Sequence, residues 1–216
     1  MEAYIPRPVQ QVRAFYGDLW TRRFDFPCVG AHLEALSEHL FKGIESGDER
    51  VHVLLSNFHP DFIGTPFIPE RLRSLKTDDA RLVHSKEFGF SLMVAACDCR
   101  YEYDPEFEAA VDAVIWGKAD ELRDLLKSHP ELVEEHSPYG HRATLLHYVS
   151  SNGVEVIRQQ VPANLVEIAE ILIENGADKG ATMRVYGGDH TPLQLLRTSA
   201  HPKAAGLLHE AESVLR

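Results

Sequence analysis

Hydrophobic positions recur at helical spacing through the first hundred residues of the chain. One apolar stripe covers residues 9–20 and a second covers residues 33–44. Side chains three and four positions apart lie on one face of a helix, so each stripe predicts an amphipathic helix. The pair Phe26-Pro27 is expected to end the first helix, and Gly47 the second, because proline and glycine interrupt helices.

Three shorter helices are predicted in the same part of the chain. The first covers residues 51–58 and the last covers residues 91–97. Between them, Thr77 is followed by two carboxylates, Asp78 and Asp79, which favour the positive end of a helix dipole. A helix is therefore expected to open at Thr77, with the threonine hydroxyl as its N-cap.

The second half of the chain contains a helix pattern with one acidic face. Residues 165–173 place apolar side chains on one side of a helical wheel, and Glu167, Glu170 and Glu174 fall on the other. Gly176 follows closely, where a left-handed residue can end a helix without a steric cost. We expect an amphipathic helix that packs through one face and carries negative charge on the other.

Two segments of this half, joined head to tail, resemble one ankyrin repeat. They are residues 143–153 (ATLLHYVSSNG) and residues 165–178 (LVEIAEILIENGAD). The Thr-x-Leu opening recurs at Thr191, and residues 107–126 supply two helices of an upstream repeat. An ankyrin repeat is a β-turn with two short antiparallel helices, which cannot bury its apolar face alone. One repeat therefore implies stacked neighbours.

The resemblance implies an all-α fold, namely an ankyrin-repeat solenoid of about three degenerate repeats preceded by a helical N-terminal capping region. The helical region is expected over residues 1–100 and the repeat domain over residues 104–216. The step between the two Thr-x-Leu openings is on the order of 14 residues longer than the 33 residues of a regular repeat. Most of the extra residues fall within 154–163. Because packing sets the separation of paired helices, this insertion is expected to project from the stack.

His147 belongs to the repeat motif and has a structural interpretation. In proteins that this chain resembles, the histidine of that motif usually hydrogen-bonds backbone groups and joins adjacent turns. We therefore expect His147 to stabilise the fold rather than to take part in catalysis.

The charge of the chain limits its partners. The 216 residues carry a net charge of −11, whereas phosphate binding needs a surplus of Lys and Arg on one face. No apolar run reaches the length of a membrane span, and the first residues lack the basic and apolar segments of a secretory signal. We expect no nucleic-acid partner, no membrane partner and a cytoplasmic location.

The cysteines and histidines predict neither a metal site nor a cofactor. The three cysteines are Cys28, Cys97 and Cys99, an odd count that fits a reducing compartment. The pair Cys97-Asp98-Cys99 lacks the two-residue gap of common zinc knuckles, and no second pair lies nearby. The histidines are scattered along the chain.

The first function class that the sequence favours is a protein-protein interaction module. Ankyrin stacks present hairpin tips and first helices along one side, where exposed aromatic, arginine and polar residues determine the partner. The negative charge would suit a basic protein partner. The candidate partner-binding residues, which lie in the hairpin loops and the 154–163 insertion, are Tyr139, His141, Arg142, Tyr148, Arg158, Gln159, Gln160, Arg184, Tyr186, Asp189 and His190. Alternatively, the apolar residues of the insertion pack against the neighbouring repeat while its polar residues face water.

The second function class is a small-molecule-binding protein or an enzyme with a His/Tyr/Arg pocket on the concave ankyrin face. The candidate side chains include groups that could act as acids and bases. The chain has no nucleophile elbow, phosphate-binding glycine loop, His-Glu-x-x-His motif or dinucleotide fingerprint. No catalytic residue is therefore assigned from the sequence.

Overall fold

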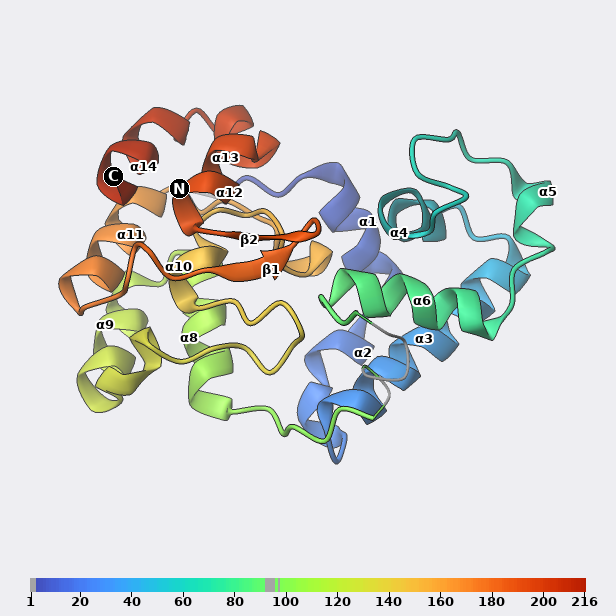
Figure 1. Ribbon diagram of the computed structural model, residues 1–216, viewed down its shortest axis with the longest axis horizontal. Helices are drawn as coiled ribbons and strands as arrows, with labels where there is room; N and C mark the ends of the chain where they lie inside the picture. The colour runs from blue at the N-terminus through green and yellow to red at the C-terminus, as the bar shows by residue number, and fades with distance from the viewer. Residues whose placement is uncertain (1–2, 92–95, 97) are drawn as a thin grey trace. The chain divides into compact units, whose positions relative to one another are not determined.

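The computed structural model describes residues 3–91, 96 and 98–216 and is mostly helical (Figure 1). The prediction of a mostly helical protein is confirmed. The helix predicted for residues 91–97, together with Cys97, falls outside the described residues except at positions 91 and 96.

The chain divides into two compact units, which are described separately. Unit 1 comprises residues 3–6, Asp104–Ser137 and His141–Arg216. Unit 2 comprises Arg7–Tyr103 and Pro138–Gly140.

Unit 2 is built from helices that follow the hydrophobic stripes of the sequence. Its elements are α1 (Arg7–Tyr16), α2 (Asp18–Thr21), the 3-10 helix η1 (Arg23–Asp25), α3 (Val29–Ser46), α4 (Val51–Phe58), α5 (Pro69–Leu72) and α6 (Thr77–Glu87). Helix α6 packs against α3 and α4, and α4 packs against α1. Helix α4 has the predicted bounds, and α3 ends at Gly47, whose φ of 73° is left-handed.

One predicted helix end and one predicted N-cap in unit 2 are wrong. The first stripe does not form one helix up to Phe26, because Gly17 has a φ of 52° and separates α1 from α2. A residue with positive φ cannot continue a right-handed helix. Helix α6 begins at Thr77, as predicted, but its N-cap is Lys76, whose backbone N–H donates to the Asp79 carboxylate at 2.7 Å.

A glycine in α3 sets the close approach of α3 to the helices around it. A Cβ atom at Gly43 would lie 2.6 Å from the Phe15 ring and 2.8 Å from Val51. Phe15 and Val51 are both buried, so neither side chain can move away without opening the core. Only a residue without a side chain fits at position 43.

Unit 1 contains helices in pairs and one β-hairpin. Its elements are α8 (Pro105–Trp116), α9 (Ala119–Ser128), η2 (Pro130–Val133), α10 (Leu145–Tyr148), η3 (Val156–Arg158), α11 (Leu165–Glu174), β1 (Met183–Val185), β2 (Gly188–His190), α12 (Pro192–Thr198), α13 (Ala200–Ala204) and α14 (Leu208–Leu215). Gly206, whose φ is 76°, separates α13 from α14.

The helices of unit 1 lie in two rows. Helix α10 packs against both α8 and α12, and α11 packs against both α9 and α14. Within the pairs, α8 packs against α9, α10 against α11 and α12 against α14 (Figure 1). The apolar faces of both rows therefore meet in one core.

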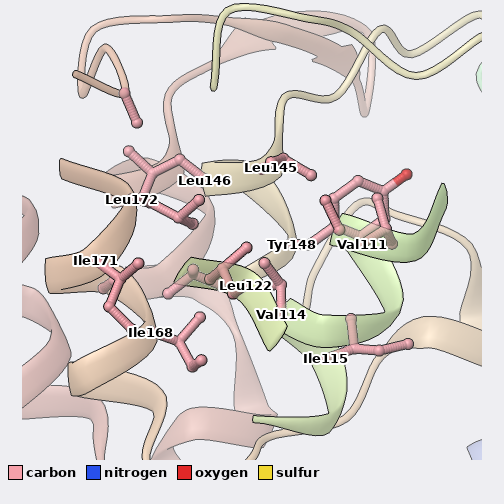
Figure 2. Packing of buried hydrophobic residues seen from close by; sticks show 14 of the residues in the cluster. Val111, Val114, Ile115, Leu122, Leu145, Leu146, Tyr148, Ile168, Ile171 and Leu172 are labelled. Carbon is pink, nitrogen blue, oxygen red and sulfur yellow. The ribbon is translucent and has the colours of Figure 1, made fainter. Parts of the chain in front are cut away.

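Figure 2 shows part of this core, in which Leu122, Leu146 and Leu172 gather from three different helices. All three side chains are at most 1% exposed. Burying one such side chain contributes about 1.5–3 kcal/mol to folding, which explains why the amphipathic stripe of α11 predicts this helix correctly.

The hairpin formed by β1 and β2 has a two-residue turn, Tyr186-Gly187, between the paired residues Val185 and Gly188. Tyr186 and Gly187 have φ angles of 55° and 80°. Positive φ at both central residues defines a type I′ turn, whose twist matches that of the flanking strands. The backbone N–H of Arg184 donates to the carbonyl of His141 at 2.9 Å, which joins the hairpin to the segment before α10.

Candidate functional site

The start of α10 is held by a histidine. The backbone N–H of Thr144 donates to Nδ1 of His147 at 3.1 Å, so the ring proton lies on Nε2. That Nε2–H donates to the carbonyl of His190 at 3.2 Å. Burial lowers the pKa of His147 to about 4, and the ring stays neutral at pH 7. These contacts agree with the structural role predicted for His147, because the ring joins α10 to the end of β2.

The prediction that the 154–163 insertion projects from the stack is wrong. Arg158 and Gln160 are each 1% exposed, and the Gln160 amide donates to the carbonyl of Ile115 at 2.6 Å. The Gln159 amide, which is half-buried, donates to the carbonyl of Val154 at 2.6 Å. Backbone groups inside a buried loop need partners, and the Gln159 amide supplies one for Val154, while the Gln160 amide joins the loop to α8.

The apolar residues of the insertion behave as the alternative interpretation predicted. Val154, Val156, Ile157 and Val161 are buried. Val161 also exchanges two backbone hydrogen bonds with Tyr4, of 2.8 and 3.0 Å. The insertion therefore packs into the core of unit 1, and Glu155, Arg158 and Gln160, which the alternative interpretation placed in water, are buried with it.

Arg158 lies at the centre of a buried charged cluster. Its guanidinium binds the carboxylate of Glu108 and lies 3.6 Å from an oxygen of Glu155. It also donates to the Tyr148 hydroxyl at 3.4 Å. Each of these side chains is at most 1% exposed. Such a cluster is tolerated in a core only when the charges are paired, since an isolated buried charge is costly.

His141 extends this cluster toward the hairpin. Its Nδ1 accepts the backbone N–H of Ala143 at 3.1 Å, so the ring proton lies on Nε2 and is donated to Glu155 at 2.9 Å. Burial raises the pKa of the Glu155 carboxyl, but Arg158 and His141 outweigh burial and hold that pKa below its usual value. Burial and the Glu155 charge raise the pKa of Tyr148 well above its usual value, so its phenol stays protonated.

The cluster contains the groups of an acid-base site, but these groups are not accessible to a substrate. An imidazole and a phenol each lie within hydrogen-bond reach of one carboxylate, as acid-base catalysis would require. However, His141 and Glu155 are 0% exposed and Tyr148 is 1% exposed. A substrate cannot reach these atoms in this conformation, so the arrangement favours a role in positioning the chain.

The predicted partner-binding residues separate into a buried and an exposed group. His141, Tyr148, Arg158 and Gln160 are buried in unit 1. Tyr139 is buried in unit 2, where its ring lies 4.8 Å from that of Phe88 and its hydroxyl donates to Tyr103 at 3.3 Å. The exposed or half-buried residues, which are the ones a partner could contact, are Arg142, Gln159, Arg184, Tyr186, Asp189 and His190.

Tyr186 is the most exposed aromatic residue at this site, with 68% of its surface accessible. Its hydroxyl donates to the side-chain oxygen of Asn152 at 2.7 Å, and its ring makes an edge contact with His190. The amide of Asn152 in turn donates to the carbonyl of Leu195 at 3.1 Å. The aromatic side chain is therefore held in place while its surface faces solvent.

Arg142 and Arg184 lie on neighbouring segments. Arg142 directly follows His141, whose carbonyl accepts the backbone N–H of Arg184. Both arginines are exposed, and Arg142 has a φ of 56°. We call the set Arg142, Arg184 and Tyr186 the hairpin surface.

Sequence reasoning missed three residues that organise the site: Glu108, Glu155 and Asn152. A signal existed for Glu108, because it shares one helical face with the apolar residues Val111 and Ile115. A carboxylate on the buried face of a helix indicates a buried cationic partner. The positions of Glu155 and Asn152 depend on loop conformations for which the sequence carries no comparable pattern.

Unit 2 contains buried histidines of its own, among them His84. The Ser37 hydroxyl donates to the carbonyl of Leu33 at 2.8 Å, so Nδ1–H of His84 donates to Ser37 at 3.0 Å. The Tyr16 hydroxyl then donates to Nε2 of His84 at 2.5 Å. Burial lowers the pKa of His84 to about 3. Because His84, Ser37 and Tyr16 are nearly inaccessible, we interpret this chain of hydrogen bonds as structural.

Comparison of the chain with protein-family models, with curated proteins and with solved structures found no match. Across residues 3–91, 96 and 98–216, no group of three His, Cys, Asp or Glu side chains is arranged to hold a metal ion. Within the same residues, no helix combines the length and the apolar character needed to cross a membrane.

Proposed function

We propose that unit 1 is an ankyrin-like helical array that binds a protein partner through the hairpin surface. The two rows of paired helices support the array, as do the left-handed Gly153 and Gly176 that follow α10 and α11. The bond from His147 to His190 supports it further, since it joins consecutive Thr-x-Leu openings. The N-terminal helices of unit 2 would act as the cap that a terminal repeat requires.

One observation carries the binding proposal: two exposed residues of the hairpin surface hold left-handed backbones. Among the described non-glycine residues, positive φ occurs only at Arg142, Ser151 and Tyr186. A type I′ turn favours Asn or Gly at the position of Tyr186, because a larger side chain is strained there. The exposed ring of Tyr186 gains little from burial, so hydrophobic packing does not account for a tyrosine at this strained position. Recognition of a partner does.

A role in recognition predicts that stability and binding respond in opposite directions at this position. Tyr186→Asn should preserve or raise the melting temperature, because asparagine suits the left-handed conformation. The same variant should bind the partner at least tenfold more weakly, a loss of about 1.4 kcal/mol.

The experiment compares Tyr186→Asn with Tyr101→Asn. Tyr101 is 64% exposed, lies in unit 2 and has a φ outside the left-handed region, so it is a matched control. Wild type and both variants are immobilised and exposed to extract of the native cell, and bound proteins are quantified by mass spectrometry. We expect one or more proteins to be retained by wild type and Tyr101→Asn and depleted on Tyr186→Asn. Equal retention on all three would contradict the proposal.

A further inference from the structure

The arginines of the hairpin surface differ from every other arginine of unit 1. The side chains of Arg142 and Arg184 form no hydrogen bond or ion pair with any described residue. Asp189 lies directly opposite Arg184 in the hairpin register, yet these two side chains form no ion pair in the described structure.

The remaining arginines of unit 1 are all paired with carboxylates. Arg123 binds Glu167 at 2.8 Å, and Arg158 binds Glu108 in the core. Arg197 and Arg216 both bind Glu212, at 2.8 and 2.7 Å. Two adjacent exceptions beside an exposed tyrosine are therefore informative.

We infer that the hairpin surface accepts an acidic peptide segment of the partner, whose carboxylates bind Arg142 and Arg184 while an apolar residue packs on Tyr186. The inference rests on the proposed function and adds the chemistry of the partner. A guanidinium presents a planar set of donors that can bind a carboxylate through two parallel hydrogen bonds. The left-handed backbone at Arg142 and the bond from Arg184 to His141 keep the two arginines on adjacent segments before the partner arrives.

The net charge of the chain does not oppose this inference at physiological ionic strength. The Debye length is then about 8 Å, so charges on distant helices are largely screened while direct contacts are not. The negative net charge of the whole chain favoured a basic partner. The local charge of the hairpin surface, which carries the two unpaired arginines, favours an acidic one.

A peptide selection tests the inference without knowledge of the partner. Random linear peptides displayed on phage are selected on the full-length protein in about 0.15 M salt, where the Debye length is about 8 Å. Enriched peptides are synthesised, and their affinities are measured by fluorescence anisotropy. The variants are Arg142→Gln/Arg184→Gln, the control Arg123→Gln/Arg197→Gln, and Tyr186→Asn. Thermal melts confirm that each variant is folded.

We expect the enriched peptides to contain an excess of Asp and Glu and to bind Arg142→Gln/Arg184→Gln at least tenfold more weakly. Affinity for Arg123→Gln/Arg197→Gln should be unchanged. Neutral or basic peptides that lose affinity only with Tyr186→Asn would overturn the acidic partner but leave the hairpin surface as a binding site. Peptides insensitive to all of these substitutions, or no enrichment on folded protein, would overturn both.

Discussion

Replacement of Arg158 by alanine should destabilise unit 1 severely. The change removes the cation that Glu108 and Glu155 share in the buried cluster, and both carboxylates are 0% exposed. Removing one partner of a buried ion pair typically costs about 3–5 kcal/mol, because the remaining charge stays in a medium that solvates it poorly. Loss of the guanidinium also removes its contact with the Tyr148 ring. Since whole domains are stable by only about 5–15 kcal/mol, a large part of the folding free energy is at stake.

The assay is urea unfolding followed by far-ultraviolet circular dichroism, with the free energy of unfolding taken from the midpoint and the slope. Gln159→Ala is the control, because Gln159 is the adjacent half-buried residue with a single local hydrogen bond; a loss of about 1 kcal/mol or less is expected there. Arg158→Met separates charge from packing, because methionine fills space without pairing the carboxylates. We expect Arg158→Met to remain strongly destabilised and Glu108→Gln to recover at least about 1 kcal/mol in its background.

A projecting insertion would give a different result. If the loop faced solvent, Arg158→Ala would unfold within about 0.5 kcal/mol of wild type, as surface substitutions usually do. That outcome, or the absence of coupling between Arg158→Met and Glu108→Gln, would refute the buried-cluster account.

Three further predictions follow from single contacts. The pKa of His84 is about 3 and that of His147 about 4, against 6.5 when unfolded. Protons therefore bind the unfolded chain first, and each histidine should lower stability by about 2 kcal/mol between pH 7 and pH 5; unchanged urea midpoints over this range would contradict the neutral assignments. His147→Ala should cost about 1–3 kcal/mol, because Thr144 and His190 lose a buried partner; a thermal melt equal to wild type would oppose the structural role. Gly43→Ala should cost about 1–3 kcal/mol through overpacking against Phe15, and unaltered melting would contradict that close approach.

The sequence was most informative where one helix face is apolar and the other polar. The bounds of α4 and the start of α11 follow from spacing alone, because burial of an apolar stripe is a local property of the sequence. Gly47 and Gly176 were recognised as helix ends for the same reason, since a glycine directly after an amphipathic stripe commonly ends the helix in a left-handed conformation.

The 154–163 insertion shows where this reasoning fails. Its charged and amide side chains suggested exposure, yet Arg158 is buried because Glu108, which lies far away in the sequence, supplies the compensating charge. The apolar face that carries Glu108 indicates a buried cationic partner, but no pattern around Arg158 identifies it as that partner. The two exposed arginines were likewise part of the predicted site, but only the structure distinguishes them from the paired arginines around them.

The most direct test of the binding proposal is photo-crosslinking from the hairpin turn. Benzoylphenylalanine is placed at position 186 or, as a control, at position 101, and cells that produce each protein are irradiated. The new side chain is aromatic, so it preserves the character of the exposed Tyr186 and Tyr101 rings. The account predicts a discrete crosslinked product from position 186 that is absent from position 101 and diminished by Arg142→Gln/Arg184→Gln. No product from position 186, or the same products from both positions, would contradict it.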